Sequence, residues 1–296
     1  MKKIALTGAT GFIGKNLLKS LIVEYGHENI LLIASKKNLQ IDTIVYNKDS
    51  KKFATNEKIM AEVVIHVGAY TPKSVEEANN VEACNSNISF TAELIKHIDE
   101  KQCKKIIYIS TLDVYSTVGT NTINENSIIN PSTLYGDSKL YCEKMISFYS
   151  KKFGISFLNL RLGHIFGKGE EKYHKIIPVT IQKVLEGNPV EIYGDGLAIR
   201  SFLNVQDVVT AISNAIKTNV SVNTINVVSE NSITIKDLVN KIISFSGQTI
   251  AVKHIETKVP NKNFIFDATL LKKYLLPKER NFDIALKEEF DYAKEL

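Results

Sequence analysis

Short apolar runs alternate with longer amphipathic stretches through the first 163 residues of the chain. The apolar runs contain few polar residues, which is typical of strands that are buried on both faces of a sheet. The stretches between them carry apolar residues at the helical period. This alternation indicates right-handed βαβ crossovers and an α/β fold with a doubly wound parallel sheet. We expect strands at 3–8, 29–35, 62–69, 105–111 and 155–163, and helices at 12–25, 87–100 and 134–153.

The pattern changes after about residue 165. Turn signals appear in "FGKGEEK" (166–172) and "YGDGLA" (193–198), and the loops become longer. We therefore expect a second, smaller unit that is interleaved with the sheet, and a site in the cleft between the two units. Regular patterns return as a helix at 204–216, a strand at 224–229 and a further helical stretch at 232–247.

Composition and charge narrow the class of protein. The chain has 296 residues, of which 44% are apolar and 23% charged, as in an ordinary globular protein with one large core or two smaller ones. The net charge is +5, and the lysines are spread along the chain, so a nucleic-acid partner is not indicated. A weakly basic balance instead favours an anionic small substrate through the field of a cleft.

The cysteine, histidine and hydropathy patterns indicate no metal site, no disulfide and no membrane segment. Cys84, Cys103 and Cys142 are odd in number and widely spaced. No histidines have the spacing of metal ligands. The chain enters a short strand and a glycine turn instead of a long apolar signal segment, and no apolar run is long enough to span a membrane. We expect a cytoplasmic protein.

The motif "LTGATGFIGKNLL" (6–18) places three glycines where the first strand should pass into the first helix. Glycine loses much conformational entropy there, so its repeated use indicates that another group comes close to the backbone. Gly8 allows a tight turn, Gly11 allows a pyrophosphate to approach, and Gly14 allows the helix to pack closely on the sheet. The helix N-terminus supplies amides and partial positive charge for phosphates. A glycine-rich turn without a ligand is the alternative, but this position favours a dinucleotide.

A tyrosine and a lysine suited to acid–base chemistry lie in "PSTLYGDSKLYCEK" (131–144). Tyr135 and Lys139 are four residues apart, so they share one face of the expected helix. A free tyrosine has a pKa of about 10, and a nearby ammonium group favours its phenolate. Tyr135 could then remove a proton from a substrate hydroxyl or return it to a ketone. An amphipathic surface helix is the alternative meaning of such a pair, so the other motifs must decide.

These motifs together resemble the extended branch of the short-chain dehydrogenase/reductase superfamily, and within it the nucleotide-sugar epimerase/dehydratase family. The resemblance implies a Rossmann-type dinucleotide-binding domain at 1–162 plus about 201–229, and a substrate-binding domain at about 163–200 plus 230–296. It rests on the glycine spacing after Thr7 and on further segments in the family's order: "EVVIHVGA" (62–69), "TLDVY" (111–115), "RLGHIFGKG" (161–169), "IYGDGLAIRSFLNVQDVV" (192–209) and "FDATLLKKYL" (266–275).

The resemblance also implies roles for individual residues. Thr111 would orient the reacting oxygen toward Tyr135, and Lys139 completes this catalytic set. Arg200 would bind the diphosphate of a nucleoside-diphosphate sugar, with a surface salt bridge as the alternative. His164 stands where an asparagine often contacts the substrate, with a buried structural histidine as the alternative. The implied cofactor contacts, besides Tyr135 and Lys139, are Gly8, Gly11, Phe12, Ile13, Gly14, Gly68, Ala69 and Asn87.

The choice of dinucleotide depends on the end of the second strand, where an NAD site usually places an acid on the ribose hydroxyls. The segment "LLIASKKN" (31–38) has no acid there but offers Ser35, Lys36 and Lys37. These groups suit a 2′-phosphate, and no carboxylate is present to repel it. We therefore favour NADP(H) over NAD(H), with solvated loop lysines as the alternative. The segment 36–60 also lacks the glycine and aspartate with which the family's third strand commonly contacts adenine.

The sequence departs from the pattern of the family's 4,6-dehydratases, which carry Thr-Asp-Glu where this chain has Thr111, Leu112 and Asp113. Leu112 cannot donate a proton, so dehydration is disfavoured. We favour a 4-ketoreductase of a 4-keto-6-deoxysugar, with an NAD-dependent nucleotide-sugar 4-epimerase as the alternative. A non-catalytic dinucleotide-binding regulator is a third hypothesis. The presence of Thr111, Tyr135 and Lys139 disfavours it. By analogy with the family, we expect a homodimer that forms through the helices at 87–100 and 134–153.

Overall fold

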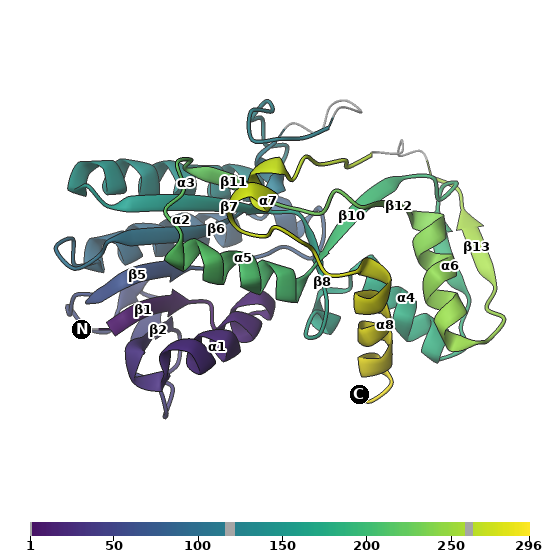
Figure 1. Cartoon of the computed structure of the whole chain (residues 1–296), viewed down its shortest axis with the longest axis horizontal. Helices are drawn as coiled ribbons and strands as arrows, with labels where there is room; N and C mark the ends of the chain where they lie inside the picture. The colour runs from purple at the N-terminus through teal and green to yellow at the C-terminus, as the bar shows by residue number, and fades with distance from the viewer. Residues whose placement is uncertain (1, 116–121, 258–262) are drawn as a thin grey trace.

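A sheet of eight strands forms the larger lobe of the protein (Figure 1). The computed structural model describes residues 2–115, 122–257 and 263–296. The strands lie in the order β11, β7, β6, β5, β1, β2, β3, β4, and only β3 and β4 pair antiparallel. They are β1 (Lys2–Thr7), β2 (Ile30–Ala34), β3 (Thr43–Asn47), β4 (Lys52–Phe53), β5 (Ala61–His66), β6 (Lys105–Thr111), β7 (Ser156–Leu162) and β11 (Thr224–Val227).

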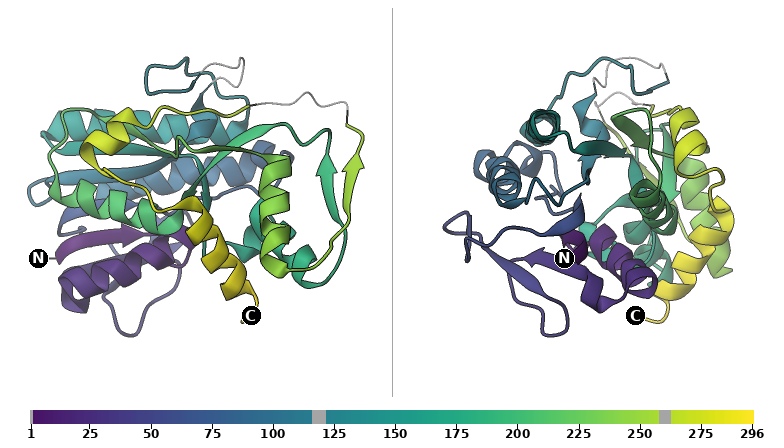
Figure 2. Two further views of the ribbon diagram at one scale, coloured as in Figure 1. Left: turned by 45° about the vertical axis from the view of Figure 1, so that its right-hand side comes forward. Right: turned by 60° about the vertical axis from the view of Figure 1, so that its left-hand side comes forward.

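Helices cover both faces of this sheet (Figure 2). Along β1, Ile4 and Leu6 join the buried cluster on one face, and Ala5 between them joins the cluster on the other face. Because strand side chains alternate with a period of two, an unbroken apolar run packs on both sides. The first face is covered by α1 (Phe12–Tyr25), α5 (Val205–Lys217) and α7 (Thr269–Tyr274), and the second by α2 (Val81–His97) and α3 (Leu134–Phe153).

The direction in which the strands follow one another reverses beside β1. This strand pairs with β2 on one side and with β5 on the other, and the chain then continues outward through β6 and β7. At such a point the loops after neighbouring strands diverge and leave a crevice at the carboxyl ends, where dinucleotides bind in doubly wound sheets. The loops after β1, β2 and β5 are therefore positioned to form a binding site.

The smaller lobe consists of shorter elements with a core of their own (Figures 1 and 2). Its strands β8 (His164–Phe166), β10 (Ile199–Asn204) and β12 (Ser232–Thr234) form one sheet, and β9 (Val190–Tyr193) pairs with β13 (Val252–Ile255). The helices α4 (Ile176–Leu185), α6 (Ile235–Ser246) and α8 (Phe282–Ala293) share one buried cluster with these strands.

Single turns of 3₁₀ helix occur in the loops of the described chain. They are η1 (His27–Asn29), η2 (Glu77–Asn79), η3 (Leu112–Val114) and η4 (Glu171–Tyr173).

The parallel sheet with helices on both faces confirms the predicted fold class. The helix expected at 87–100 spans Val81–His97 instead, because Asn80 caps its first turn by accepting a hydrogen bond from Ala83 N at 2.9 Å. The hairpin of β3 and β4 was not predicted from the polar segment 36–60. No helix among the described residues combines the length and the apolar character that crossing a membrane requires.

The packing of residues 264–276 refines the division into domains. Phe266, Leu271 and Leu275 lie in the buried cluster of the sheet, not in the core of the smaller lobe. The chain therefore returns to the larger lobe at about 264–276 before α8 joins the smaller one. We propose the remaining domain boundaries as the sequence predicts them.

Candidate active site

The glycine turn between β1 and α1 depends on close backbone contacts. Gly8 has a φ of +72°, and a Cβ there would lie 2.5 Å from the backbone nitrogen of Gly68. Gly11 N donates a hydrogen bond to Gly8 O at 3.0 Å, which closes the turn. A Cβ on Gly14 would lie 2.0 Å from the same carbonyl oxygen. Side chains at Gly8 and Gly14 would therefore push the ends of β1 and β5 and the first turn of α1 apart.

Gly11 is less crowded than Gly8 and Gly14. The nearest atom that its Cβ would meet is Gly8 O, at 3.3 Å. Gly11 is the N-cap of α1, no side chain caps this helix, and its first turn contains no acid. The first amides of α1 are thus available to an anion, in a cavity of about 1120 Å³ that Gly11, Phe12, Ile13 and Ala69 help to line. This uncapped helix start, at a glycine that lines the cavity and has no side chain to fill it, fits the pyrophosphate of a dinucleotide.

A chain of hydrogen bonds fixes the opposite wall of the cavity. Gly68 N donates to Thr7 Oγ1 at 2.8 Å, and Thr7 Oγ1 lies 2.9 Å from His66 Nδ1. His66 Nε2 lies 2.9 Å from Thr91 Oγ1, which donates to the Asn87 carbonyl at 2.8 Å. Since Thr91 gives its hydrogen to Asn87, it accepts one from Nε2, and Nδ1 accepts from Thr7. Burial lowers the pKa of His66 to about 3, so the ring stays neutral.

Asn87 joins this wall to the two helices beside the site. Its Oδ1 accepts a hydrogen bond from Tyr70 N at 2.7 Å, and its Nδ2 donates to Ser138 Oγ at 3.2 Å. The loop after β5, helix α2 and helix α3 are therefore held together by one side chain.

Tyr135, Lys139 and Thr111 meet at the carboxyl end of β6. Tyr135, in the first turn of α3, is 8% exposed, and it lines the cavity together with Thr111, the last residue of β6. Its side chain is hydrogen-bonded with those of Thr111 and of Thr71, in the loop after β5. Lys139, one helical turn later, is 2% exposed, and its ammonium group donates to Ile109 O at 2.6 Å.

Burial and the charge of Asp113 favour a protonated phenol at Tyr135. Burial, and next the charge of Asp113, raise the pKa of Tyr135, while hydrogen bonds with Thr71 and Thr111 lower it in part. Burial lowers the pKa of Lys139 to about 8. The sequence predicts that Lys139 favours the phenolate. The structure shows the opposite net direction, because burial has the largest effect on the phenol.

Thr111 is also bound to Asp113. Thr111 Oγ1 donates to Asp113 Oδ2 at 2.9 Å and accepts from Asp113 N at 3.2 Å. Burial raises the pKa of this carboxyl group, and the bond from Thr111 lowers it in part. Because the Thr111 hydroxyl gives its hydrogen to Asp113, its oxygen accepts from Asp113 N and from the Tyr135 hydroxyl. Leu112 lines the same cavity and contributes only an apolar side chain.

Comparison with known proteins identifies this arrangement. The NAD dependent epimerase/dehydratase family matches residues 4–228. The chain belongs to this family. The resemblance found in the sequence is therefore confirmed.

Named proteins with similar sequences or structures include epimerases and dehydratases. The chain is 28% identical to the dTDP-D-glucose 4,6-dehydratase of Dictyostelium discoideum over 273 residues, which cover 83% of this chain and 62% of that protein. The structure of the UDP-N-acetylglucosamine 4-epimerase of Methanobrevibacter ruminantium M1, in complex with UDP-N-acetylmuramic acid, matches with a TM-score of 0.85 at 25% identity and covers 100% of this chain and 99% of its own. The UDP-glucuronic acid 4-epimerase of Bacillus cereus, in complex with NAD, matches with a TM-score of 0.84 at 22% identity, over 99% of each chain.

The residues that the sequence predicts for the choice of dinucleotide follow β2, and part of the cavity lies at the end of this strand. Ser35 and Lys36 line it, and Gly68, after β5, lines the same cavity. Lys37 does not line it. It lies instead near Asp42, whose carboxyl pKa is lowered chiefly by Lys2 and to a lesser extent by Lys37.

His164 and Arg200 lie at the other end, where the smaller lobe meets the sheet. His164 lines the cavity, and its ring packs near those of Phe202 and Phe264, with centroids 5.7 and 5.5 Å away. Burial lowers its pKa to about 4, and its Nδ1 has no hydrogen-bond partner among the described residues. Arg200 is not among the lining residues, and its guanidinium group lies 4.8 Å from the Phe264 centroid and donates to Ile199 O at 2.8 Å. Its role in binding diphosphate stays a prediction.

Several lining residues were not singled out from the sequence. Thr71 beside Tyr135, and Lys175 in the smaller lobe, lie in polar loop segments that carry no recognisable spacing.

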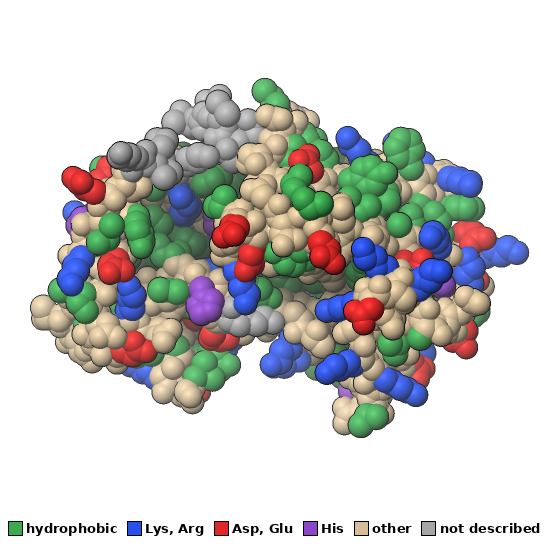
Figure 3. All heavy atoms as spheres, turned by 180° about the vertical axis from the view of Figure 1, so that it is seen from behind, with side chains coloured by type: hydrophobic (Ala, Val, Ile, Leu, Met, Phe, Trp, Pro, Cys, Tyr) green, Lys and Arg blue, Asp and Glu red, His purple; other side chains and the backbone are tan. Residues whose placement is uncertain are grey.

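Six lysines and a single aspartate are among the described residues that line the cavity, so it suits anionic ligands. Seen from behind, the molecule is hollowed between its two lobes, and both basic and acidic side chains lie around the hollow (Figure 3). The lysines are Lys36, Lys48, Lys51, Lys73, Lys139 and Lys175.

Proposed function

We propose that this protein is an NAD(P)-dependent oxidoreductase of a nucleoside-diphosphate sugar, and specifically a 4-ketoreductase of a 4-keto-6-deoxysugar. The observation that carries the proposal is the buried phenol of Tyr135, bonded to Thr111 in the cavity that begins at the glycine turn. A bound nicotinamide dinucleotide supplies or accepts the hydride of such a reaction. Its pyrophosphate would be held by Gly11 and the first amides of α1.

The protonation state of Tyr135 supports the reductive direction. Burial and Asp113 raise its pKa, so Tyr135 carries its proton at neutral pH and can give it to a ketone oxygen. Thr111 Oγ1, whose hydrogen is given to Asp113, is hydrogen-bonded with the Tyr135 hydroxyl and so helps to orient this phenol toward the ketone oxygen. Lys139 remains largely an ammonium group below a pH of about 8 and stabilises the negative charge left on Tyr135.

The cofactor end and the loop after β6 support the narrower assignment. The positions after β2 that line the cavity are Ser35 and Lys36, with no carboxylate to hold two ribose hydroxyls, which favours NADP(H). Leu112 cannot serve as an acid or a base, which disfavours loss of water. We propose Asn87, Gly68 and Ala69 as contacts on the nicotinamide side, and His164 and Arg200 as contacts for the substrate.

A nucleotide-sugar 4-epimerase is the second candidate. It is supported by the likeness to solved 4-epimerases over the whole chain, which includes the smaller lobe. The phenol of Tyr135 would act as both base and acid in a 4-epimerase, because an epimerase must remove a proton and return it. A non-catalytic regulator is disfavoured, since Thr111, Tyr135 and Lys139 lie together in the cavity.

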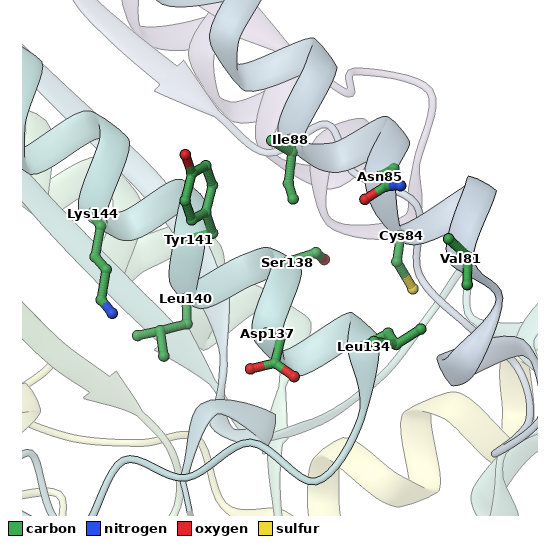
Figure 4. Close-up of a pocket in the computed structure, with 10 residues that line it drawn as sticks. All are labelled: Val81, Cys84, Asn85, Ile88, Leu134, Asp137, Ser138, Leu140, Tyr141 and Lys144. Atoms are coloured by element: carbon green, nitrogen blue, oxygen red, sulfur yellow. The ribbon is translucent and has the colours of Figure 1, made fainter.

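We further propose that the protein is a cytoplasmic homodimer. Cys84, Cys103 and Cys142 are buried free thiols, as expected of a reducing compartment. Between α2 and α3 lies a surface pocket of about 350 Å³, to which both helices contribute side chains (Figure 4). Along α3, Tyr141 and Phe148 are seven residues apart and 52% and 75% exposed, so they form an apolar stripe to which a second copy of the helix pair can dock.

Two measurements test the proposed function. The first is to denature the purified protein and identify any released dinucleotide by mass spectrometry. Tightly retained NAD would support the epimerase and contradict the reductase. A protein without bound dinucleotide that binds NADPH more tightly than NADH would support the reductase.

The second measurement is the turnover of Tyr135→Phe. We expect kcat to fall by about 10²–10⁴-fold, because the proton donor is lost. Dinucleotide affinity should stay within about twofold, since the ring still packs in place. Tyr193→Phe, on an exposed ring of β9, is the matched control. Normal turnover by Tyr135→Phe would show that another group moves the proton.

A further inference from the structure

Two lysines on the β3–β4 hairpin line the dinucleotide cavity although they are far in sequence from the glycine turn. They are Lys48 and Lys51, and Lys36 after β2 lines the same cavity. We propose that Lys48 and Lys51, here called the hairpin lysines, complete with Lys36 and Ser35 a site for the 2′-phosphate of an adenine dinucleotide. This inference rests on the proposed use of NADP(H), and it names the hairpin residues that would give the preference for NADP(H) over NAD(H).

Strand register brings these residues to one edge of the sheet. Strands β2 and β3 are parallel and paired so that Ala34 lies opposite Val45. Ser35 and Lys36 therefore follow β2 where Tyr46 and Asn47 complete β3, with Lys48 immediately beyond. Because neighbouring strands are about 4.8 Å apart, the two segments present their side chains together at the carboxyl edge.

The hairpin that carries the lysines has a defined geometry. Tyr46 lies opposite Phe53 in the antiparallel ladder of β3 and β4. Asn47 Oδ1 accepts hydrogen bonds from the backbone nitrogens of Asp49 and Ser50 at 2.9 and 3.0 Å, which fixes the turn. Tyr46 also lines the cavity, and its ring centroid lies 4.5 Å from that of Phe90. The backbone turn that carries the lysines is therefore defined, and it follows an aromatic residue that lines the same cavity.

The carboxylates near this edge do not line the cavity. Asp42 is paired with Lys2 at 2.7 Å, and Lys37 also lies near it. Asp49 belongs to the same turn as the hairpin lysines but is not among the lining residues. The one aspartate among the described lining residues is Asp113, at the carboxyl end of β6. A phosphate group with about two negative charges would therefore meet lysine ammonium groups and no carboxylate among the described residues that line this part of the cavity.

The backbone of Lys51 supports a role for its side chain. Its φ is +55°, in the left-handed region that glycine or asparagine adopts at lower energy. A strained residue that keeps a long cationic side chain at the rim of a cavity is a candidate for ligand binding. The same strain provides a sharp test, because Lys51→Gly removes the ammonium group and relieves the backbone.

The test measures binding without turnover. Full-length protein is titrated by calorimetry with adenosine 2′,5′-bisphosphate, with adenosine 5′-monophosphate and with adenosine 3′,5′-bisphosphate. The variants are Lys48→Gln, Lys51→Gln and Lys51→Gly. Lys37→Gln is the matched control, since it removes the same charge from a neighbouring residue outside the cavity.

We expect the unaltered protein to bind the 2′,5′-bisphosphate about tenfold or more tightly than the 5′-monophosphate. Each hairpin variant should reduce this preference by about three- to fivefold, as expected for exposed charge pairs. Lys37→Gln should leave it unchanged. Lys51→Gly should keep its melting temperature, which separates loss of the ammonium group from loss of the fold.

The remaining outcomes overturn the inference in distinguishable ways. If the preference survives in all three hairpin variants, Ser35 and Lys36 suffice and the hairpin is not part of the site. If the 3′,5′-bisphosphate binds as tightly as the 2′,5′-isomer, the lysines attract any phosphate and form no specific site. If the unaltered protein binds the monophosphate equally well, the NADP(H) preference fails too, while the oxidoreductase proposal still depends on Tyr135→Phe.

Discussion

Replacing Gly14 by alanine would test whether α1 packs on the β1 turn as closely as the structure shows. Two effects of opposite sign compete at this position. Alanine is the better helix former and on that ground alone would stabilise α1 by about 1 kcal/mol. Its Cβ, however, would lie 2.0 Å from Gly8 O and 2.7 Å from Gly8 C.

The steric effect should prevail. Ordinary contact begins at 3.4 Å, so one of the two backbones must retreat by 1.4 Å. Neither can do so freely, because Gly8 is in close contact with Gly68, and Leu17 and Leu21 fix α1 as fully buried side chains. Overpacking costs about 1–3 kcal/mol, and a clash between backbone atoms belongs at the upper end of this range. After subtraction of the helix propensity we expect a net loss of about 2 kcal/mol.

Thermal unfolding followed by circular dichroism measures this loss. A loss of about 2 kcal/mol should lower the melting temperature by about 4 °C or more. Gly11→Ala is the matched control, since its Cβ meets only Gly8 O at 3.3 Å and otherwise faces the cavity. It should melt close to the unaltered protein but bind a dinucleotide more weakly. A Gly14→Ala protein that melts at or above the unaltered temperature would show that helix propensity prevails and that the close contact is absent.

Two further predictions concern a buried acid pair and the surface of α3. Burial, and next the charge of Glu170, raise the pKa of Glu289, and burial raises that of Glu170. Carboxyl groups with raised pKa values bind more protons in the folded state, so they lower stability as the pH rises from about 4.3 through the raised values. The melting temperature of Glu289→Gln should therefore fall less between pH 5 and pH 9 than that of the unaltered protein. Glu288→Gln changes an exposed residue, so its melting temperature should depend on pH as that of the unaltered protein does. Parallel pH curves for all three proteins would refute this prediction. If the protein is the homodimer proposed above, light scattering should find Phe148→Lys as a monomer and Val23→Lys, on α1, as a dimer. A dimer that survives Phe148→Lys would exclude the stripe of Tyr141 and Phe148 as the interface.

The parallel sheet could be predicted because its strands are buried on both faces and therefore appear as unbroken apolar runs. The same reasoning missed β3, which is short and contributes only Ile44 and Tyr46 as buried side chains. An alternating pattern of five residues between polar segments cannot be distinguished from a loop by periodicity. The early start of α2 depends on Asn80, one polar residue whose capping role becomes visible only with the helix in place.

The parts of the site that could be predicted are those whose chemistry lies in local spacing. Glycines three residues apart, and a tyrosine four residues before a lysine, keep their relation in any helix or turn that they enter. Thr71 and the hairpin lysines reach the cavity only through the folding of distant segments, so no local pattern marks them. The direction of the Tyr135 pKa was missed for a related reason, because burial depends on everything packed around the phenol.

Helix α1 also connects the glycine turn, the proposed pyrophosphate site, to the smaller lobe. Asn16 Nδ2, two residues after Gly14, donates to Lys168 O at 3.2 Å. Gln206 Nε2 donates to Asn16 Oδ1 at 3.1 Å. The loop that leads from β8 into the smaller lobe is therefore attached to the helix whose first amides face the cavity. Gly169 in this loop has the Phe12 ring 3.6 Å from where its Cβ would lie.

This connection predicts how the two glycine variants should differ at the substrate end. Gly14→Ala moves α1 and with it the loop at Lys168, so it should weaken the binding of a nucleotide sugar as well as that of the dinucleotide. Gly11→Ala adds a methyl group to the glycine turn and leaves Asn16 in place, so nucleotide-sugar affinity should change little. Equal losses of nucleotide-sugar affinity in both variants would mean that the two ligands are coupled through the cavity itself. A loss confined to Gly14→Ala would assign the coupling to the position of α1.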